Sequence, residues 1–388
     1  MRNFDFNKEA SSEKEKRNIE ILDILRKRGP LSRPEISKDM GINVVTISNY
    51  INDFIKNNLV FEKELDISEG GRRPLLLDLN PQAGFVIGVG LNLTNMVGVL
   101  VDLKGNIITK TQAARPKVSA KEISECALEI IREILRRSKE YSSGIKGIGI
   151  GVAGLVNKDT GSIHWPQKMG RYYTYLSLDL PLRELIEKEF GFPCLIENDA
   201  TSACFGEQWF GVGQGYKNII YMFSGVGCGI MINGDVYRGA KGYAGEASIY
   251  SHKEEDIFNC NLGPECFIKP WEADLGILQD TGKSDLRSVF NLVLQGDKQA
   301  SKALIRAAKR LGVKIAFLVN LLNPEMVVIG GGLEDAGDDF LKEINSTVND
   351  WAFRESAEGL RIVFSQLREN SVALGAASIV IQRIFAQA

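Results

Sequence analysis

The sequence lacks the features that would place the chain in a membrane or in an oxidising compartment. No apolar run reaches the roughly 18 residues that a membrane-spanning helix needs, and residues 1–18 are too polar for a signal peptide. The six cysteines show no disulfide-like spacing and lie mostly within apolar runs, which favours reduced thiols. We therefore expect a cytoplasmic protein.

The chain also lacks a surplus of charge of either sign. Its formal net charge is −2 over 388 residues. Overall charge thus gives no support to nucleic-acid binding, so any such role has to come from a local module. The length exceeds what a single core usually holds, which predicts two or three domains.

Residues 1–75 predict a domain of three short helices. Ser32 and Glu35 form a capping box at the start of the second helix. Gly41 suits the left-handed end of that helix, and Asn43 suits the N-cap of the third. An amphipathic segment, 17–29, supplies the first helix. The residues expected to form the small core are Ile21, Leu22, Leu25, Ile47, Ile51, Phe54 and Ile55.

The third helix exposes short polar and methyl-bearing side chains near its start, as readout of base edges in the DNA major groove requires. These side chains are Val44, Val45, Thr46, Ser48 and Asn49. The next segment predicts two strands around a turn at 70–71, with Arg72 and Arg73 placed to enter a minor groove. The pattern is typical of a winged helix-turn-helix.

Basic and acidic residues nearly balance within this domain, so affinity for phosphate depends on basic side chains gathered on one face. The candidates are Arg26, Lys27, Arg28, Arg33, Lys38, Arg72 and Arg73. The alternative is a protein-interaction module whose basic cluster is a solvated face.

The rest of the chain repeats one pattern. Residues 84–108 and 218–239 each predict three strands joined by a glycine-containing turn and a tight turn, and each is followed by a helix and a strand. We expect two α/β lobes with a ligand cleft between them, over residues 76–200 and 201–370, the first completed by a helix at 371–388.

These segments resemble the ROK family (repressors, open reading frames, kinases), in its regulator branch. The matching stretches are GGRRPLLLDLNPQAGFVIGV, GIGIGVAGLVNKDTGSI, PCLIENDATSACFGE, FSGVGCGIMINGDVYRGAKGYAGE and NLLNPEMVVIGGGLE, and the likeness spans about residues 16–380. It implies an N-terminal winged helix-turn-helix followed by an α/β body of two lobes with the actin/hexokinase-like (duplicated ribonuclease H-like) fold.

The resemblance also allows the kinase positions to be compared. Kinases of the family carry an acid and a glycine for Mg-ATP where this chain has Gly90 and Asn92, and a glycine of the second phosphate loop is replaced by Phe223. Phosphoryl transfer depends on positioning and charge stabilisation. We therefore expect no catalysis, and we expect the remaining glycines to form tight turns.

The sugar-binding positions of the family are partly kept. Asn198 and Asp199 match the pair that binds sugar hydroxyls, and Glu246 matches a glutamate that also contacts the sugar. A carboxylate that accepts from a hydroxyl anchors a ligand even without catalysis. The alternative for Asp199 is a capping or turn residue after a buried strand. His164, Trp165 and Trp271 could stack on a sugar face, although such aromatics are more often core residues.

The zinc site of the family is not kept, so we expect no cofactor. Ile249 replaces the ligating histidine and Leu262 replaces a cysteine, which leaves Cys260 as the one matched ligand. A rearranged site with Cys266 and His252 is the alternative.

Together these features predict a sugar-responsive transcriptional regulator, most simply a repressor of carbohydrate-utilisation genes. A sugar or polyol would close the lobes and release a homodimer or homotetramer from a palindromic operator on double-stranded DNA. The alternatives are a ROK-type sugar kinase, a DNA-binding regulator that has lost its sugar response, and an activator, which differs from a repressor only in which state binds DNA.

Overall fold

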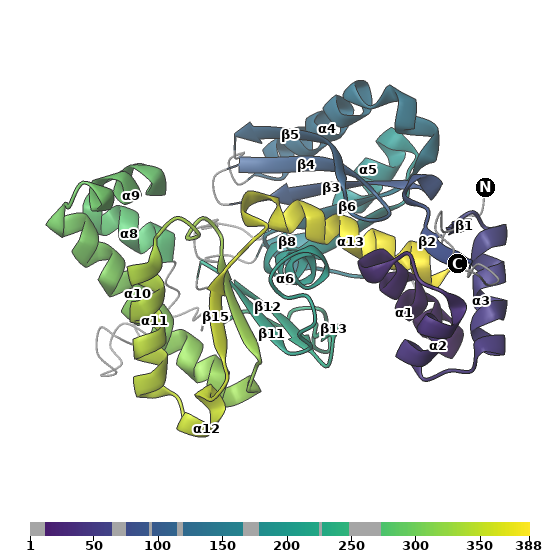
Figure 1. Ribbon diagram of the computed structural model, residues 1–388. Helices are drawn as coiled ribbons and strands as arrows, with labels where there is room; N and C mark the ends of the chain where they lie inside the picture. Colours follow the sequence, from purple (N-terminus) through teal and green to yellow (C-terminus); the bar gives the residue numbers. More distant parts are fainter. Residues whose placement is uncertain are drawn as a thin grey trace.

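The computed structural model describes residues 12–63, 75–92, 95–114, 119–165, 178–224, 227–247 and 273–388. An N-terminal module of helices lies against one end of a larger body that has two α/β lobes (Figure 1). Within the described ranges, no helix is long and apolar enough to cross a membrane.

The N-terminal module has the predicted helices and strand pair. It consists of α1 (Glu13–Arg28), α2 (Arg33–Met40), α3 (Val44–Lys56) and the antiparallel strands β1 (Val60–Lys63) and β2 (Leu76–Leu79). The Ser32–Glu35 capping box starts α2, and Gly41 ends it with a φ of 64°. The Asn43 side chain accepts from the backbone N–H of Thr46 at 2.8 Å, as an N-cap should.

The hydrophobic core of this module contains the predicted residues, with one difference in burial. Six of the seven expected residues are fully buried, whereas Ile55 is half-buried at the edge of the cluster. The wing strands extend past residue 75, since β2 pairs with β1 from residue 76 onward. How the chain divides into domains stays a prediction, and the turn with Arg72 and Arg73 lies outside the described residues.

The first lobe is built on a sheet of strand order β10-β6-β3-β4-β5. Its strands are β3 (Phe85–Leu91), β4 (Asn95–Asp102), β5 (Ile107–Ala114), β6 (Ile145–Val152) and β10 (Cys194–Asn198). Around it lie η1 (Pro81–Ala83), α4 (Ala120–Arg137), η2 (Lys139–Gly144), α5 (Leu182–Phe190) and a small sheet of β7 (Leu155–Val156), β8 (Ile163–Trp165) and β9 (Leu178–Leu180). The helices α4 and α5 share the hydrophobic core of one face of the large sheet.

The second lobe repeats this plan with the order β13-β12-β11-β14-β15. Its strands are β11 (Ile219–Phe223), β12 (Gly227–Ile232), β13 (Asp235–Val236), β14 (Met326–Gly330) and β15 (Arg361–Phe364). Its helices are α8 (Ala273–Thr281), α9 (Leu286–Leu294), α10 (Lys298–Leu322), α11 (Asp338–Trp351) and α12 (Arg354–Ala357). In both lobes three antiparallel strands are extended by two parallel ones, so the predicted repeat is confirmed.

Two helices occupy the space between the two large sheets (Figure 1). They are α6 (Asp199–Phe210) and α13 (Ser371–Ala386), which follows η3 (Arg368–Asn370). They cross so closely that a Cβ on Gly375 would lie 1.7 Å from the carbonyl oxygen of Ser202, which only glycine avoids. The helix α13 also covers β3 and β6 of the first lobe.

The N-terminal module shares a hydrophobic core with the body. The amide of Asn18 on α1 donates to the carbonyl oxygen of Ala386 at 3.0 Å, near the end of α13. Arg26 on α1 lies 4.5 Å from the ring centroid of Trp209 and 4.8 Å from that of Phe210, both on α6. Its Nη1 donates to the carbonyl oxygen of Trp209 at 3.2 Å.

The prediction that Arg26 contributes to a DNA-facing basic cluster is therefore wrong. Its side chain is 4% exposed and pairs with Asp23 at 2.7 Å. Burial lowers the pKa of the Arg26 guanidinium, and the charge of Asp23 partly offsets that. Helical periodicity places this residue on a side of α1 but does not tell whether solvent or another domain covers that side.

Candidate ligand site and DNA-contact surface

Two of the predicted sugar-binding residues lie where β10 passes into α6. Asn198 is the N-cap of α6, and its Oδ1 accepts from the N–H of Thr201 at 3.1 Å while its Nδ2 donates to the Gly154 carbonyl at 3.3 Å. Asp199 is the first residue of the helix, 7% exposed, and its Oδ1 accepts from the N–H of Ala200 at 2.8 Å. Asn198, rather than Asp199, therefore caps the helix. Its Oδ1 can accept one more hydrogen bond and its Nδ2 can donate one more, and both are available to a ligand.

Glu246 reaches the same place from the second lobe. The preceding residue, Gly245, accepts from the N–H of Cys228 on β12 at 2.8 Å, and Glu246 forms an isolated bridge to Gly227. Its Oε2 is buried with no hydrogen-bond partner among the residues that the structure describes. Burial is the main reason that the pKa of Glu246 is raised to about 7, and the charge of Asp199 contributes to the same rise. The structure thus brings the buried Asp199 of the first lobe close to the half-buried Glu246 of the second, so that their charges interact.

This pKa shift predicts how stability depends on pH. The folded-state pKa of Glu246 is raised above its ordinary value of 4.5, so the folded state holds the proton more tightly than the unfolded chain does. The free energy of unfolding should fall as pH rises from about 4.5 to about 7 and then level off. Glu246→Gln should remove this loss, which is at most about 3 kcal/mol and smaller if water reaches the group.

The measurement is the urea midpoint of the wild type and of Glu246→Gln at several pH values. We expect the two curves to converge at low pH and to separate as pH rises. A separation that is the same at every pH would contradict the raised pKa.

A buried cluster of charged residues, which the sequence did not predict, lies next to Asn198. Glu197, 3% exposed, pairs through Oε2 with Lys158 Nζ at 2.5 Å and with Arg238 Nε at 3.0 Å, and its Oε1 accepts from the N–H of Asn198 at 2.9 Å. Burial alone would raise its pKa, but Lys158 and Arg238 hold the pKa of Glu197 at about 2. Because Lys158 belongs to the first lobe and Arg238 to the second, the cluster ties the lobes together beside the ligand residues.

Of the three aromatic residues suggested as sugar platforms, the structure contradicts one. Trp165 is fully buried in the core of the first lobe, so the suggestion that it stacks on a sugar is wrong. The Nδ1 of His164 lies 2.9 Å from Asp179 Oδ1 on the neighbouring strand. Trp271 lies outside the described residues, as do Ile249, His252, Cys260, Leu262 and Cys266, so the loss of the zinc site stays a prediction.

The residues at the positions of the kinase phosphate loops pack against other parts of the chain. A Cβ on Gly90 would lie 2.6 Å from the backbone nitrogen of Ala373 on α13, so a larger residue there requires α13 to move. The Nδ2 of Asn92 donates to the carbonyl oxygen of Glu369 at 2.9 Å. In the second loop, Phe223 is 7% exposed within the core, and the carbonyl of Ser224 accepts from the N–H at the start of α8 at 2.8 Å.

Carboxyl groups also lie beside these loops. The hydroxyl of Ser224 hydrogen-bonds the buried carboxylate of Asp274 on α8. Glu334 follows the glycine turn after β14, and burial raises its pKa to about 7. Acidic groups in this position oppose the binding of a polyphosphate.

The start of α3 exposes three of the five expected residues, whereas Thr46 and Ser48 are half-buried. Val45 is 72% exposed, Val44 is 41% exposed, and Asn49 is exposed. The hydroxyl of Ser48 donates to the Val44 carbonyl at 2.8 Å, so its hydrogen is already used within the helix. Val45 and Asn49 are therefore the side chains freest to meet base edges.

The remaining basic residues of the module are mostly paired on its surface. Arg33 contacts Glu62 on the wing at 2.9 Å, and Lys27 contacts Asp23 at 2.7 Å. Arg28 pairs with Asp39, whereas Lys38 is exposed. Phosphate binding by Arg28 or Arg33 thus requires exchange of an ion pair, which costs little at the exposed Arg28 and more at the half-buried Arg33. Their role at DNA stays a prediction.

One helix runs from the candidate ligand site to the N-terminal module. The 12 residues of α6 begin at Asp199 in the ligand site and end at Phe210 against α1 of the N-terminal module. At a rise of about 1.5 Å per residue the helix spans about 18 Å. The helix therefore forms one continuous element between the ligand residues and α1.

Comparison with known proteins agrees with this arrangement. A model of the ROK family matches residues 86–383. A putative xylose repressor from Caldicellulosiruptor sp. (strain Rt8B.4) is 32% identical, over 94% of this chain and 95% of the relative. The xylose repressor of Bacillus subtilis (strain 168) is 30% identical, over 93% of this chain and 94% of its own.

Solved structures show the same fold. A ROK family transcriptional regulator described as a homologue of the Escherichia coli MLC protein has a TM-score of 0.75 at 20% identity and covers 96% of this chain and 97% of its own. A ROK family glucokinase from Streptomyces griseus has a TM-score of 0.60 at 24% identity, covering 76% of this chain and 99% of its own. At these identities the likeness concerns the fold, and the predicted actin/hexokinase-like body is confirmed.

Proposed function

The chain belongs to the ROK family, and from that premise we propose that it is a sugar-responsive transcriptional repressor of carbohydrate-utilisation genes. The relatives named as xylose repressors match both the N-terminal module and the body. The observation that carries the proposal is α6, since this helix has the candidate ligand carboxylate Asp199 at one end and the contact with Arg26 at the other.

The proposed mechanism uses these contacts in sequence. A sugar or polyol is held between Asn198 and Asp199 on one side and Glu246 on the other, which draws the lobes together. The start of α6 moves with the ligand, and its end displaces α1. In a symmetric homodimer or homotetramer, that changes the spacing of paired α3 helices from the roughly 34 Å that two operator half-sites need. The ligand acts only as far as it binds the two states unequally.

The test is capture and sequencing of genomic fragments bound by the purified chain at one fixed salt concentration, with and without xylose and a panel of sugars and polyols. We expect enrichment of an inverted repeat and its release by one ligand. Enrichment that no ligand changes would favour a regulator without a sugar response. Failure to enrich any fragment would overturn the DNA-binding function.

Asn49 provides a sharper test of how the operator is read. Asn49→Ala should weaken binding to the captured operator by about 1–3 kcal/mol, because an asparagine that pairs with an adenine edge loses both hydrogen bonds. Binding to an unrelated duplex at the same salt should not change. Fluorescence anisotropy measures both, and an equal loss on the two duplexes would contradict base readout.

We further propose that the body does not transfer phosphate. Support comes from the carboxyl groups of Asp274 and Glu334 beside the loops and from the packing of Gly90 against α13. A family kinase also needs a charged acid at position 90 for its metal. Sugar-dependent consumption of ATP by the purified chain would overturn this proposal.

Gly90→Asp tests whether the missing acid alone explains the absence of catalysis. The added Cβ would lie 2.6 Å from Ala373 N and 2.8 Å from Val372 Cβ, so we expect overpacking that costs about 1–3 kcal/mol of folding free energy. We expect no gain of ATP turnover. A variant that is as stable as the wild type and phosphorylates sugar would show that the cleft lacks only this acid for catalysis.

A further inference from the structure

Exposed apolar side chains gather on the second lobe, where α10 and α11 end. Leu321 on α10, Trp351 on α11 and Phe353 after it are each more than half exposed. The backbone N–H of Phe353 donates to Asn320 Oδ1 on α10 at 2.8 Å, so the ends of the two helices lie together. Single exposed apolar residues are ordinary, but a group of large ones rimmed by polar residues is typical of a protein–protein contact.

The first half of α10 differs from this end, because its exposed side is mostly basic. Four residues at the spacing of one helix face lie there, namely Lys302, Ile305, Arg306 and Lys309. Arg306 pairs with Asp280 at 3.1 Å, and Lys309 pairs with Glu343 at 3.6 Å. Lys302 forms no ion pair within the part of the chain that the structure describes.

Acidic residues flank the apolar cluster at the other end. The exposed charged residues there are the acids Asp350, Glu355 and Glu358 and one base, Arg354. The helices α10 and α11 run in the same direction, because Lys309 contacts Glu343 and, further along both helices, Asn320 contacts Phe353. One end of the surface is therefore basic with a single apolar residue, Ile305, and the other end is acidic with several large ones.

We propose that this surface, which comprises the exposed side of α10 and residues 350–358, binds a second copy of the chain. In an antiparallel two-fold pair, the first half of one α10 opposes the apolar and acidic end of the other, and each contact is made twice. The Lys302 ammonium of one copy then lies near the exposed carboxylates of the other. The aromatic side chains of one copy cover Ile305 of the other and the aliphatic stems of its basic neighbours.

The dimensions of the surface agree with such a pair. The helix α10 has 25 residues and α11 has 14, so with about 1.5 Å of rise per residue and about 10 Å between neighbouring helices they cover about 600 Å². A standard interface buries about 800 Å² on each partner. The surface approaches that size only when the contact runs along most of α10 and includes α12, as the antiparallel arrangement requires.

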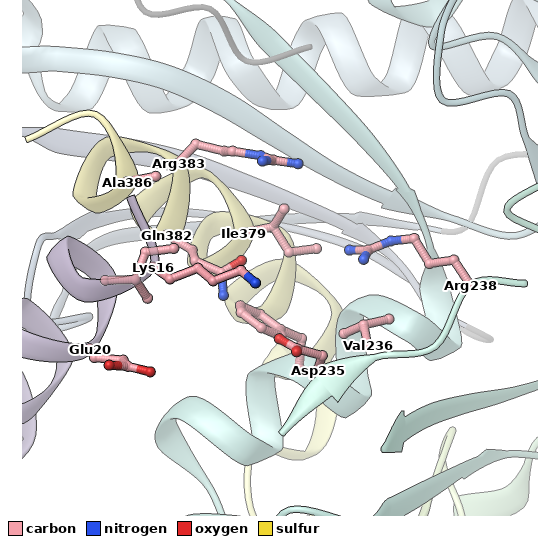
Figure 2. A pocket seen from close by; sticks show the side chains of 11 residues that line it. Lys16, Glu20, Asp235, Val236, Arg238, Ile379, Gln382, Arg383 and Ala386 are labelled. Atoms are coloured by element: carbon pink, nitrogen blue, oxygen red, sulfur yellow. The ribbon is translucent and has the colours of Figure 1, made fainter. Parts of the chain in front are cut away.

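The place of this surface gives it a role in the proposed function. Figure 1 shows α10 and α11 at the opposite end of the molecule from α1, α2 and α3. A pocket of about 380 Å³ lies between α1 and the segment around β13 of the second lobe, with Lys16 and Glu20 on one side and Asp235 and Arg238 on the other (Figure 2). The pocket leaves room for the N-terminal module to move relative to the second lobe.

Two copies joined through their second lobes would convert lobe closure into a change of spacing. The second lobes stay fixed to each other, so a movement between the lobes of each copy changes the distance between the two N-terminal modules. Two operator half-sites sense that distance. This consequence rests on the proposed function, whereas the interface does not.

Analytical ultracentrifugation of the full chain, without DNA or sugar, tests the interface. We expect a dimer at micromolar concentration, and Phe353→Asp should raise its dissociation constant about 30-fold or more, as loss of an aromatic anchor does. Leu185→Asp is the matched control, because Leu185 is an exposed leucine on α5 of the first lobe. Both variants should fold, since neither side chain belongs to a hydrophobic core.

Chemical cross-linking tests the antiparallel arrangement. Lys302 and Asn320 lie on the same side of α10 about five turns apart, and the proposed pair brings them opposite each other. The two-fold axis then passes near the middle of α10, so Val313→Cys should join two chains through a short bismaleimide. Ile305→Cys is the control, because its two copies would lie about 20 Å apart. The wild type, with its six cysteines, sets the background yield.

Three results would overturn the inference. These are a wild-type chain that stays monomeric at micromolar concentration, Phe353→Asp that dimerises as tightly as the wild type, and Ile305→Cys that cross-links as readily as Val313→Cys. A dimer that Phe353→Asp dissociates but that binds no operator would refute the proposed function and leave the interface standing.

Discussion

Asp199→Asn is expected to abolish the effect of sugar on operator binding while leaving operator affinity without sugar unchanged. A hydrogen bond between a carboxylate and a ligand hydroxyl contributes about 1.5–3 kcal/mol, so sugar affinity should fall about 10- to 150-fold. The fold should tolerate the change, because an amide oxygen can still accept from the N–H of Ala200, which the carboxylate does at 2.8 Å. Calorimetry with the effector and anisotropy with the operator measure the two effects.

A second readout shows whether Asp199 acts at the predicted place. Its charge contributes to the raised pKa of Glu246, so the asparagine variant should shift the pH dependence of stability toward lower pH. Asp338→Asn is the matched control, because Asp338 is an exposed acid in the first turn of α11. Unchanged sugar affinity in Asp199→Asn would remove Asp199 from the ligand site.

The N-terminal module could be predicted almost residue by residue because its signals are local. The capping box at Ser32, the left-handed Gly41 and the N-cap Asn43 each depend on neighbours within a few positions. The contacts between Arg26 and α6 could not be predicted in this way. Its partners, Trp209 and Phe210, lie far along the chain, and only tertiary packing brings them to α1.

The candidate ligand site was predictable only where a motif marks it. Asn198, Asp199 and Glu246 lie in segments that resemble the family, and the structure places Asp199 and Glu246 close enough for their charges to interact. The role of Glu197, the residue before Asn198, could not be predicted, because the sequence does not show which basic residues pair with it. Lys158 and Arg238 come from connecting segments in different lobes, and no local pattern pairs them with Glu197.

Arg26→Met is expected to separate sugar binding from operator release. Methionine keeps much of the apolar stem that packs against Trp209 and Phe210 but loses the cation and the hydrogen bond to the Trp209 carbonyl. Coupling between two sites is commonly worth about 1–3 kcal/mol, a factor of about 5–150. We expect most of that factor to vanish, so that operator affinity with and without sugar becomes nearly equal, while sugar affinity stays within about twofold of the wild type.

Lys27→Met distinguishes this relay from a general effect of charge on α1. Lys27 is the next residue and pairs with the same Asp23 at 2.7 Å, but among the described residues it makes no ion pair or hydrogen bond with α6. Its replacement removes the same charge and should leave release by sugar intact. If both variants lose release equally, the net charge of the module matters and α6 is not the connection. If Arg26→Met keeps full release, the movement reaches the module by another route, and α13, which contacts α1 through Asn18, becomes the element to change.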